Sequence, residues 1–408
     1  MKKLFLLTFC LTFSSLFAQK SIQQVLQNYL DEEKLAGISV MIWQDDQLKI
    51  NEHAGFQDLE SQTPTHSQSL FRLASMTKPL TTVAFMKLVE EGKIRLETPL
   101  ETYIPQYANL KVYKESGEYE ELKRPLIMKD LLMHTSGIGS GSLGNTPVDA
   151  MIRDHDFSEV KTLAEFVETF AEFPLIHQPG EGFTYSVNTD ILARVIELIS
   201  GQNFGDYLHK NVLKPLKMNH TFFQVPESEK SNMTSVYAMS ESGLEKIAGP
   251  DKGFAPFARG NTGLVSTPED YLRFTQMLLN GGKLGDVRIL KKKTVELMTT
   301  NHLPDAIFPI DPMEMEIAHS GFGLGFAVVN RKGQPWAKAP LSITQVGNLP
   351  EGSFYWLGAL NTYFWVDPGN GVTGVIMSQS RDVHKLHLFQ EVVEGFYGEN
   401  EEVSLGNN

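Results

Sequence analysis

Cysteine is almost absent from this chain of 408 residues, because its only copy is Cys10. That residue lies in an apolar segment at the N-terminus, so the sequence downstream of it has no thiol. Disulfide bonds and thiolate catalysis are therefore excluded for the rest of the chain. A folded product has to rely on a large hydrophobic core.

Basic residues are also in short supply. Lys and Arg number 36 against 49 Asp and Glu, which gives a net charge of −13 at pH 7. This balance argues against nucleic acid or an anionic membrane as the main partner. The 11 histidines lack the paired spacing of a metal site, and no Gly-x-Ser-x-Gly motif marks a Ser-His-Asp hydrolase. We therefore expect neither a metal nor another cofactor.

Only one apolar run is long enough to suggest a targeting segment. Met1-Lys2-Lys3 precedes the apolar residues 4–17, and Ala18-Gln19 follows. These features are typical of a secretory signal peptide, with cleavage expected after Ala18. The run is too short for a comfortable membrane span, and no other segment is apolar enough to cross a bilayer. The sequence thus predicts a protein that is exported to the periplasm or secreted, and it leaves the oligomeric state open.

What the chain does have is a serine and a lysine three residues apart. Ser75 and Lys78 stand where an apolar segment turns into a predicted amphipathic helix. Residues at this spacing share a helix face, so the amine can reach the hydroxyl from one turn away. At a helix start, unpaired N–H groups and the positive end of the dipole favour developing negative charge. The pattern indicates a nucleophile with its base close by.

The same four-residue pattern recurs at Ser158 and Lys161. That copy follows a charged run with no apolar strand before it, so we interpret it as solvated surface. For Ser75 too, a capping serine with an exposed lysine is the alternative, because short motifs match by chance. The sequence context has to decide between the two.

Hydrophobic periodicity predicts an α/β fold. Residues 37–43 are typical of a buried strand with a hairpin partner at 48–54, and segments rich in aromatic and β-branched residues follow residue 322. These segments predict an antiparallel sheet flanked by helices, an α+β sandwich, with a mostly helical domain inserted. The predicted division is 1–18 signal peptide, 19–95 and 251–400 α/β domain, 96–250 helical insertion and 401–408 tail.

Two further segments line up with the serine and lysine. Tyr185 follows a Pro-Gly turn and precedes a predicted helix, and Trp356-Leu357-Gly358-Ala359 lies in a strand-like run. With Ser75 and Lys78, these segments resemble the three motifs of the serine β-lactamase and penicillin-binding protein superfamily. The resemblance is closest to its class C-like branch, with the family VIII carboxylesterases. It implies a β-lactamase/transpeptidase-like fold.

The resemblance also implies roles for these residues. Ser75 would carry the acyl group, Lys78 would have its pKa lowered by burial, and Tyr185 would act as base and then acid. The backbone N–H groups of Ser75 and Ala359 would hold the oxyanion. Gly358 would let substrate pass close to its strand.

Two positions depart from the family pattern. The third position of the tyrosine motif, usually Asn, is Val187, so a polar contact to Lys78 or substrate is missing or comes from Asn188. The third motif opens with Trp356 instead of a cation that would hold a substrate carboxylate. We expect Trp356 to line an apolar acyl or alcohol pocket, as suits an esterase.

The sequence therefore predicts an exported serine hydrolase, an esterase or β-lactamase-related enzyme, acting on a small-molecule ester, β-lactam or peptide. D-alanyl-D-alanine carboxypeptidase or β-lactamase proper is the alternative within the same acyl-enzyme chemistry. A penicillin-binding sensor or cell-wall-binding protein is the non-enzymatic alternative. The presence of Ser75, Lys78 and Tyr185 together argues against it, since a binding scaffold has no need of all three.

Overall fold

The computed structural model describes residues 22–252, 255–307, 320–330, 349–382 and 385–405. The predicted signal peptide at 1–18, including Cys10, lies outside these residues. Among the helices that the structure describes, none combines the length and the hydrophobicity that a bilayer span requires.

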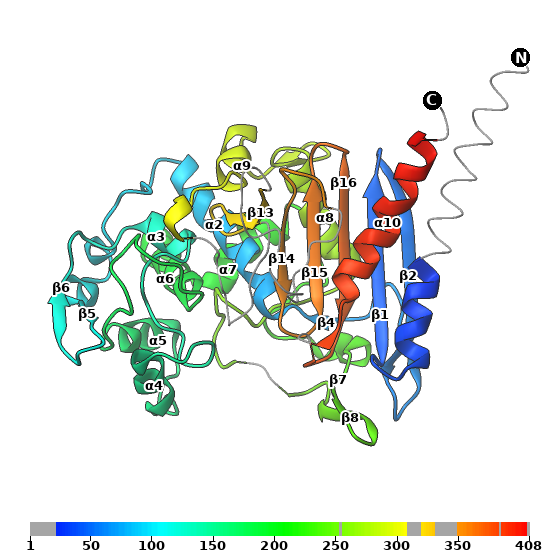
Figure 1. Cartoon of the computed structure of the whole chain (residues 1–408), viewed down its shortest axis with the longest axis horizontal. Coiled ribbons are helices and arrows are strands. Elements are labelled where there is room, and N and C mark those ends of the chain that lie inside the picture. Colours follow the sequence, from blue (N-terminus) through cyan, green and yellow to red (C-terminus); the bar gives the residue numbers. More distant parts are fainter. Residues whose placement is uncertain (1–21, 253–254, 308–319, 331–348, 383–384, 406–408) are drawn as a thin grey trace, which may run out of the picture.

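One large antiparallel sheet forms the centre of the molecule (Figure 1). In the described part of the chain its eight strands lie in the order β12-β13-β14-β15-β16-β1-β2-β3. They are β1 (Gly37–Gln44), β2 (Gln47–Asp58), β3 (Thr63–Pro64), β12 (Ser320–Phe322), β13 (Ala327–Val329), β14 (Phe354–Gly358), β15 (Thr362–Asp367) and β16 (Val372–Ser378). Because β1 pairs with both β16 and β2, the two ends of the chain share one sheet, which confirms the predicted fold class.

Helices pack on both faces of this sheet and beyond one edge. A helix also covers residues 22–31. The α-helices that follow are α2 (Thr77–Glu90), α3 (Met128–Leu132), α4 (Pro147–Asp154), α5 (Leu163–Phe170), α6 (Asn188–Ser200), α7 (Phe204–Leu208), α8 (Pro268–Leu279), α9 (Lys292–Met298) and α10 (Leu388–Leu405).

Aromatic side chains alternate between the two faces of the sheet. Tyr363 on β15 stacks on Phe389 of α10, with ring centroids 5.2 Å apart. The neighbouring Phe364 lies 5.4 Å from Tyr271 of α8. Successive strand residues point to opposite faces, so α10 covers one face and α8 the other. The helix at 22–31 lies on the α10 side (Figure 1).

Helix α2, which follows Ser75, crosses the middle of the molecule. Its residues from Thr77 to Met86 are buried on every side, so the prediction of an amphipathic helix is wrong. A helix enclosed all round belongs to the core of a large protein. Its buried hydroxyls find partners inside the fold, as Thr81 shows by donating to the Gly260 carbonyl at 2.7 Å.

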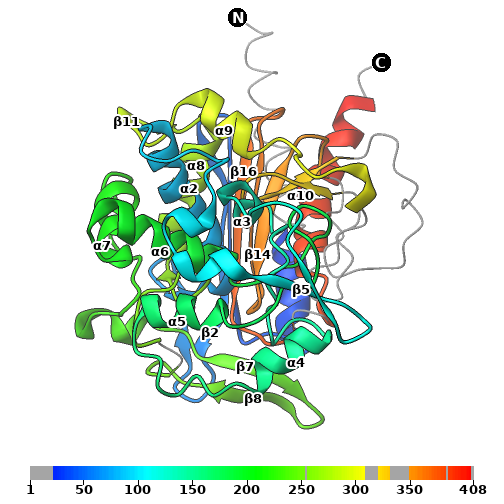
Figure 2. The same ribbon diagram turned by 90° about the vertical axis from the view of Figure 1, so that its left-hand side faces the viewer.

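Helices α3 to α6 group together on the side of α2 away from the sheet (Figures 1 and 2). The segment 96–250 also contains two hairpins that the sequence did not indicate. They are β5 (Lys111–Tyr113) with β6 (Tyr119–Glu121), and β7 (Val236–Ser240) with β8 (Gly243–Ala248). The domain boundaries at residues 95 and 250 stay predictions.

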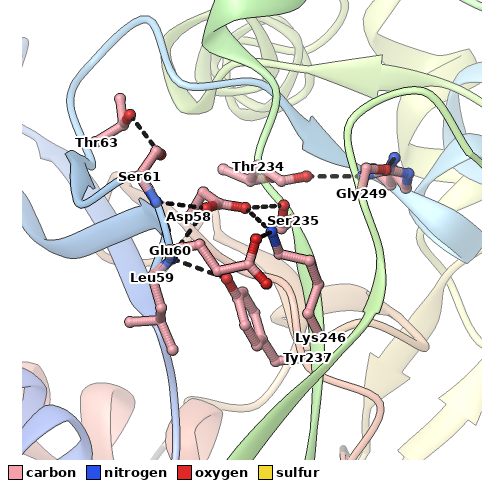
Figure 3. Close-up of polar contacts among 11 residues, drawn as sticks. Asp58, Leu59, Glu60, Ser61, Thr63, Thr234, Ser235, Tyr237, Lys246 and Gly249 are labelled. Carbon is pink, nitrogen blue, oxygen red and sulfur yellow. Dashed lines mark hydrogen bonds and ion pairs between the residues drawn. The ribbon is translucent and has the colours of Figure 1, made fainter.

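A polar cluster ties the β7–β8 hairpin to the end of β2 (Figure 3). Lys246 on β8 lies 2.6 Å from Asp58 and 2.7 Å from Glu60. Ser235 donates to Asp58 at 2.6 Å, and the hydroxyl of Tyr237 accepts from the Leu59 N–H at 2.8 Å. We call these residues the β2 clamp.

The C-terminal part differs from prediction in two details. The strand-like run at 353–366 is a hairpin, because β14 and β15 are joined by a turn in which Asn361 has a φ of 61°. Helix α10 continues to Leu405 and so enters the segment predicted as a tail at 401–408, a division that stays a prediction.

Candidate active site

Ser75 lies in a tight turn between a short strand and the buried helix α2. Strand β4 (Phe71–Arg72) pairs with β9 (Val265–Ser266), and the 3-10 turn η1 (Ala74–Met76) connects β4 to α2. Ala74 has a φ of 46°, a left-handed conformation that residues other than glycine rarely adopt. This turn leaves Ser75 partly exposed at a cavity of about 480 Å³.

Lys78 stands one helical turn further on, as the sequence predicted from its spacing. Its Nζ lies 3.1 Å from Ser75 Oγ, and its side chain is buried. Burial lowers the pKa of Lys78 to about 7, while the charge of Asp190 acts to raise it and that of Arg259 to lower it. A large part of the amine is therefore uncharged at neutral pH, when it can accept a proton.

Asn261 holds the amine from the other side. Lys78 Nζ lies 2.8 Å from its side-chain Oδ1 and 3.2 Å from its carbonyl oxygen. A neutral amine has two N–H groups and one lone pair. When Asn261 accepts from both N–H groups, the lone pair is left for the hydroxyl proton of Ser75.

An ion pair between the partly exposed Arg259 and the buried Asp190 helps to fix the position of Asn261. Asp190 on α6 accepts from the Asn261 backbone N–H at 3.1 Å and from Arg259 Nη2 at 2.6 Å. Sequence reasoning missed Asp190, Arg259 and Asn261 as site residues. Nothing in the sequence indicates that the Asn261 side chain, 183 positions away, meets Lys78.

Tyr185 packs against Lys78 and Ser75. The Lys78 Nζ lies 4.4 Å from the centre of its ring, and its hydroxyl is hydrogen-bonded to Ser75. Burial raises the pKa of Tyr185 above its ordinary value, although its hydrogen bonds with Ser75 and Trp356 oppose the change. The phenol therefore keeps its proton at neutral pH. This favours Lys78 as the base, in place of the predicted Tyr185.

Trp356 does not line the cavity, contrary to prediction. It is 2% exposed, and its Nε1–H donates to the Tyr185 hydroxyl at 3.1 Å. Its ring packs against Phe322, with centroids 5.4 Å apart. Trp356, which stands in the place of the family's cation, thus donates its hydrogen bond to the Tyr185 hydroxyl and not to a substrate.

The apolar wall of the cavity comes from the helical region instead. Five of its side chains are Leu143, Ile152, Phe157, Phe166 and Phe170. Sequence reasoning missed them, because phenylalanines spaced by four on a helix are as typical of a core as of a pocket.

Asn188 does not replace the missing motif asparagine. It is buried, its Oδ1 accepts from Ser136 Oγ at 2.6 Å, and its Nδ2 donates to His134 Nδ1 at 2.8 Å. Of the alternatives left open, Asn188 does not supply the contact to Lys78, and Asn261 makes that contact. Burial, with the charge of Lys78, holds the pKa of His134 well below its ordinary value, so His134 stays neutral beneath the site.

Gly358 and Ala359 lie at the end of β14, beside the Ser75 turn. A Cβ at Gly358 would collide with the Leu73 carbonyl oxygen and with Thr362 Oγ1. Glycine is thus needed so that β14 can approach the turn, and the next residue, Ala359, lines the cavity with Ser75. The predicted reason for Gly358, space for substrate, is replaced by space for the protein's own backbone.

The second copy of the motif is surface, as predicted. Ser158 and Lys161 are both exposed, and the Lys161 amine donates to the Ser158 carbonyl instead of its hydroxyl. Burial thus separates two identical sequence patterns. The Lys78 amine is buried in the core with a lowered pKa, whereas the Lys161 amine is solvated.

Comparisons with known proteins show the family to which the chain belongs. A family model described as Beta-lactamase matches residues 22–392. The chain is 31% identical over 367 residues to the uncharacterized protein MT1414 of Mycobacterium tuberculosis, with 86% of each chain covered. Its structure is similar to that of EstCE1, a hydrolase with promiscuous acyltransferase activity, with a TM-score of 0.79 and 23% identity over 95% of this chain and 100% of that one.

A third similarity is to the octameric penicillin-binding protein homologue from Pyrococcus abyssi. The TM-score is 0.68 and the identity 22%, over 92% of this chain and 77% of that one. The family model spans the sheet, helix α2 and the segments that carry Ser75, Lys78, Tyr185 and Ala359. The chain therefore belongs to the β-lactamase family of serine hydrolases.

Proposed function

We propose that this protein is an exported serine hydrolase that forms an acyl-enzyme on Ser75 and prefers ester substrates. The observation that carries the proposal is the buried Lys78 amine, 3.1 Å from Ser75 Oγ and with a pKa of about 7. An amine with an ordinary pKa would be charged at neutral pH and could not accept the proton of a serine.

Acylation starts with the neutral amine. Lys78 takes the hydroxyl proton as Ser75 Oγ attacks the carbonyl carbon, and the carbonyl oxygen becomes an oxyanion. The backbone N–H groups of Ser75 and Ala359 are the donors proposed for that oxyanion, each worth about 3 kcal/mol in comparable sites. As the tetrahedral intermediate collapses, the Lys78 ammonium returns its proton to the leaving alcohol oxygen. Tyr185 holds Ser75 Oγ by its hydrogen bond throughout.

Deacylation repeats these steps with water as the nucleophile. Lys78, neutral again, takes a proton from water, the hydroxide attacks the acyl carbon, and the acid leaves as Ser75 regains its proton. Asn261 matters in both half-reactions, because it directs the lone pair of the amine towards the reacting oxygen.

Two observations favour esters over β-lactams or D-alanyl peptides. Trp356 stands where a cation would hold the carboxylate of those substrates, and its indole N–H is occupied by Tyr185. The cavity wall beside Ser75 carries three phenylalanines. EstCE1, whose fold is similar, is described as a hydrolase with acyltransferase activity, which adds support.

Export is proposed from the N-terminal sequence alone. Two lysines, a short apolar run and Ala18 are typical of a signal peptide. The absence of cysteine downstream of Cys10 is compatible with an oxidising compartment, where no thiol would need protection.

Hydrolysis of short-chain para-nitrophenyl esters tests the proposal. The purified protein should hydrolyse the butyrate ester, and Ser75→Ala should lower kcat by at least about a thousandfold. Nitrocefin and a D-Ala-D-Ala peptide, assayed on the same sample, distinguish the substrate classes. Faster turnover of nitrocefin than of the ester would overturn the ester preference, and equal ester hydrolysis by Ser75→Ala would overturn the mechanism.

A further inference from the structure

The cavity at Ser75 carries positive charge in a protein that is strongly acidic. Lys78, Arg153 and Arg259 line it, and no Asp or Glu of the described chain does. The whole sequence has a net charge of −13. A cleft lined by one sign of charge raises the local concentration of ligands of the opposite sign. This cavity should therefore attract anions, although the protein as a whole repels them.

Only one of the three cations is both charged and available. Arg259 is paired with the buried Asp190 at 2.6 Å. Lys78 is about half neutral at pH 7, since its pKa is about 7, and Asn261 holds its amine through two contacts. Arg153, on α4, is exposed, and its Nη1 donates to the carbonyl oxygens of Gly141 and Gly144. Within the described residues its Nε and Nη2 donate to no protein acceptor and no carboxylate forms an ion pair with it.

The acid one helical turn before Arg153 is occupied elsewhere. Asp149, one turn before Arg153, accepts hydrogen bonds from the backbone N–H groups of Ser140, Gly141 and Thr146. Asp149 and Arg153 thus hold the loop at 140–146 from two sides, one through its N–H groups and the other through its carbonyl groups. Arg153 lines the cavity, and its Nε and Nη2 remain available as donors.

We propose that the substrate carries a carboxylate that Arg153 binds, while its apolar part lies against Phe157, Phe166 and Phe170. This inference rests on the proposed function, because it assigns a substrate class to the Ser75 cavity. A planar guanidinium with two unused donor nitrogens matches the two oxygens of a carboxylate. The substrate is then an ester of a dicarboxylic acid, or a comparable acyl compound with an acidic group remote from the scissile bond.

A matched pair of substrates tests the charge directly. Mono-para-nitrophenyl glutarate is anionic, and its methyl ester is neutral with the same acyl chain. The wild-type protein should prefer the anionic member by about tenfold in kcat/KM, and rising salt should reduce the preference. Arg153→Gln should abolish the preference, whereas Arg153→Lys should keep part of it.

The Lys variant separates charge from loop structure, because Arg153 also holds the loop carbonyls. Equal loss of the preference in Arg153→Gln and Arg153→Lys would mean that Arg153 only positions the loop, and it would overturn the inference. So would a wild-type protein that hydrolyses both esters equally well. In those cases ester hydrolysis itself persists, so the proposed function stands while the inference fails.

A binding measurement removes the dependence on turnover. Calorimetry with the Ser75→Ala variant compares phenylbutyrate with phenylbutyramide. The carboxylate should bind about tenfold more tightly than the amide, and the additional change Arg153→Gln should remove the difference. Equal affinity for the two compounds in the Ser75→Ala variant would contradict the inference even if no ester is hydrolysed.

Discussion

At the scale of single residues, the reactivity of Ser75 depends on where the hydrogens of one amine point. Asn261 accepts from Lys78 through both its side chain and its backbone, at 2.8 and 3.2 Å. The backbone oxygen is present whatever the side chain, so substitution at residue 261 changes only one of the two contacts. Asn261 is thus a positioning residue that acts through Lys78.

Two substitutions at Asn261 should move the pH dependence of catalysis in opposite directions. Lys78 must be neutral to act, so kcat/KM should rise with pH through its pKa of about 7. In Asn261→Asp, a carboxylate beside the amine favours the charged form, and the acid limb should shift up by about one pH unit. In Asn261→Ala, an acceptor that stabilises the ammonium is lost, so the limb should shift down and the plateau should fall.

Ester hydrolysis measured from about pH 5 to pH 9 gives the acid limb of each variant and of the wild type. Asn280→Asp is the control, since it adds the same charge at an exposed position after α8 and should leave the limb where it is. If the limb of Asn261→Asp coincides with that of the wild type, Asn261 does not set the state of the amine.

At the scale of elements, the β2 clamp joins a hairpin of the 96–250 segment to the central sheet. Burial acts to raise the pKa of Asp58, but hydrogen bonds from Lys246 and Ser235 outweigh it and hold that pKa below its ordinary range. The folded pKa is thus lower than the unfolded one. The contribution of Asp58 to stability is present in full above the unfolded pKa, near pH 4, and is lost gradually as the pH falls from there through the lower folded pKa.

Asp58→Asn should therefore lower the free energy of unfolding at pH 7 by about 1 to 2 kcal/mol. Urea unfolding at pH 7 and near pH 3 measures this, and the difference between the variant and the wild type should be smaller at the lower pH. Glu60→Gln is the matched control, because Glu60 contacts the same lysine but is 77% exposed, and its loss should matter little. An equal effect of both substitutions at pH 7 would contradict the assignment.

At the scale of the whole molecule, the sheet is built from both ends of the chain. Helix α10 covers one of its faces, with Phe389 against Tyr355, Tyr363 and Trp365. Truncation after residue 387 would expose this aromatic face. We expect the shortened chain to aggregate or to lose cooperative unfolding, since large exposed apolar patches are not tolerated in soluble monomers.

Truncation after Asn400 is the control. It keeps the buried residues Phe389, Val392, Val393 and Phe396, so the chain should stay soluble and unfold in a single transition by circular dichroism. Normal folding of the chain that ends at residue 387 would show that α10 is dispensable for the sheet.

The sequence predicted the parts of this molecule that local chemistry specifies. The sheet followed from strands rich in aromatic and β-branched residues, and the spacing of Ser75 and Lys78 followed from helical pitch. Contacts between residues that are far apart in the chain could not be predicted from such local patterns. Asn261, 183 positions from Lys78, supplies the amide that was sought at Asn188, and α5 supplies the apolar wall that was assigned to Trp356. The all-round burial of α2 likewise depends on neighbours that no local pattern names.

Covalent labelling tests the central claim, an activated nucleophile at Ser75, most directly. A fluorophosphonate should add one label to the peptide that contains Ser75, and mass spectrometry of the digested protein should find none in Ser75→Ala. The labelling rate should rise with pH and be half-maximal near pH 7, where Lys78 loses its proton. Absence of an adduct on Ser75, or an adduct on the neighbouring Ser186 instead, would contradict the claim.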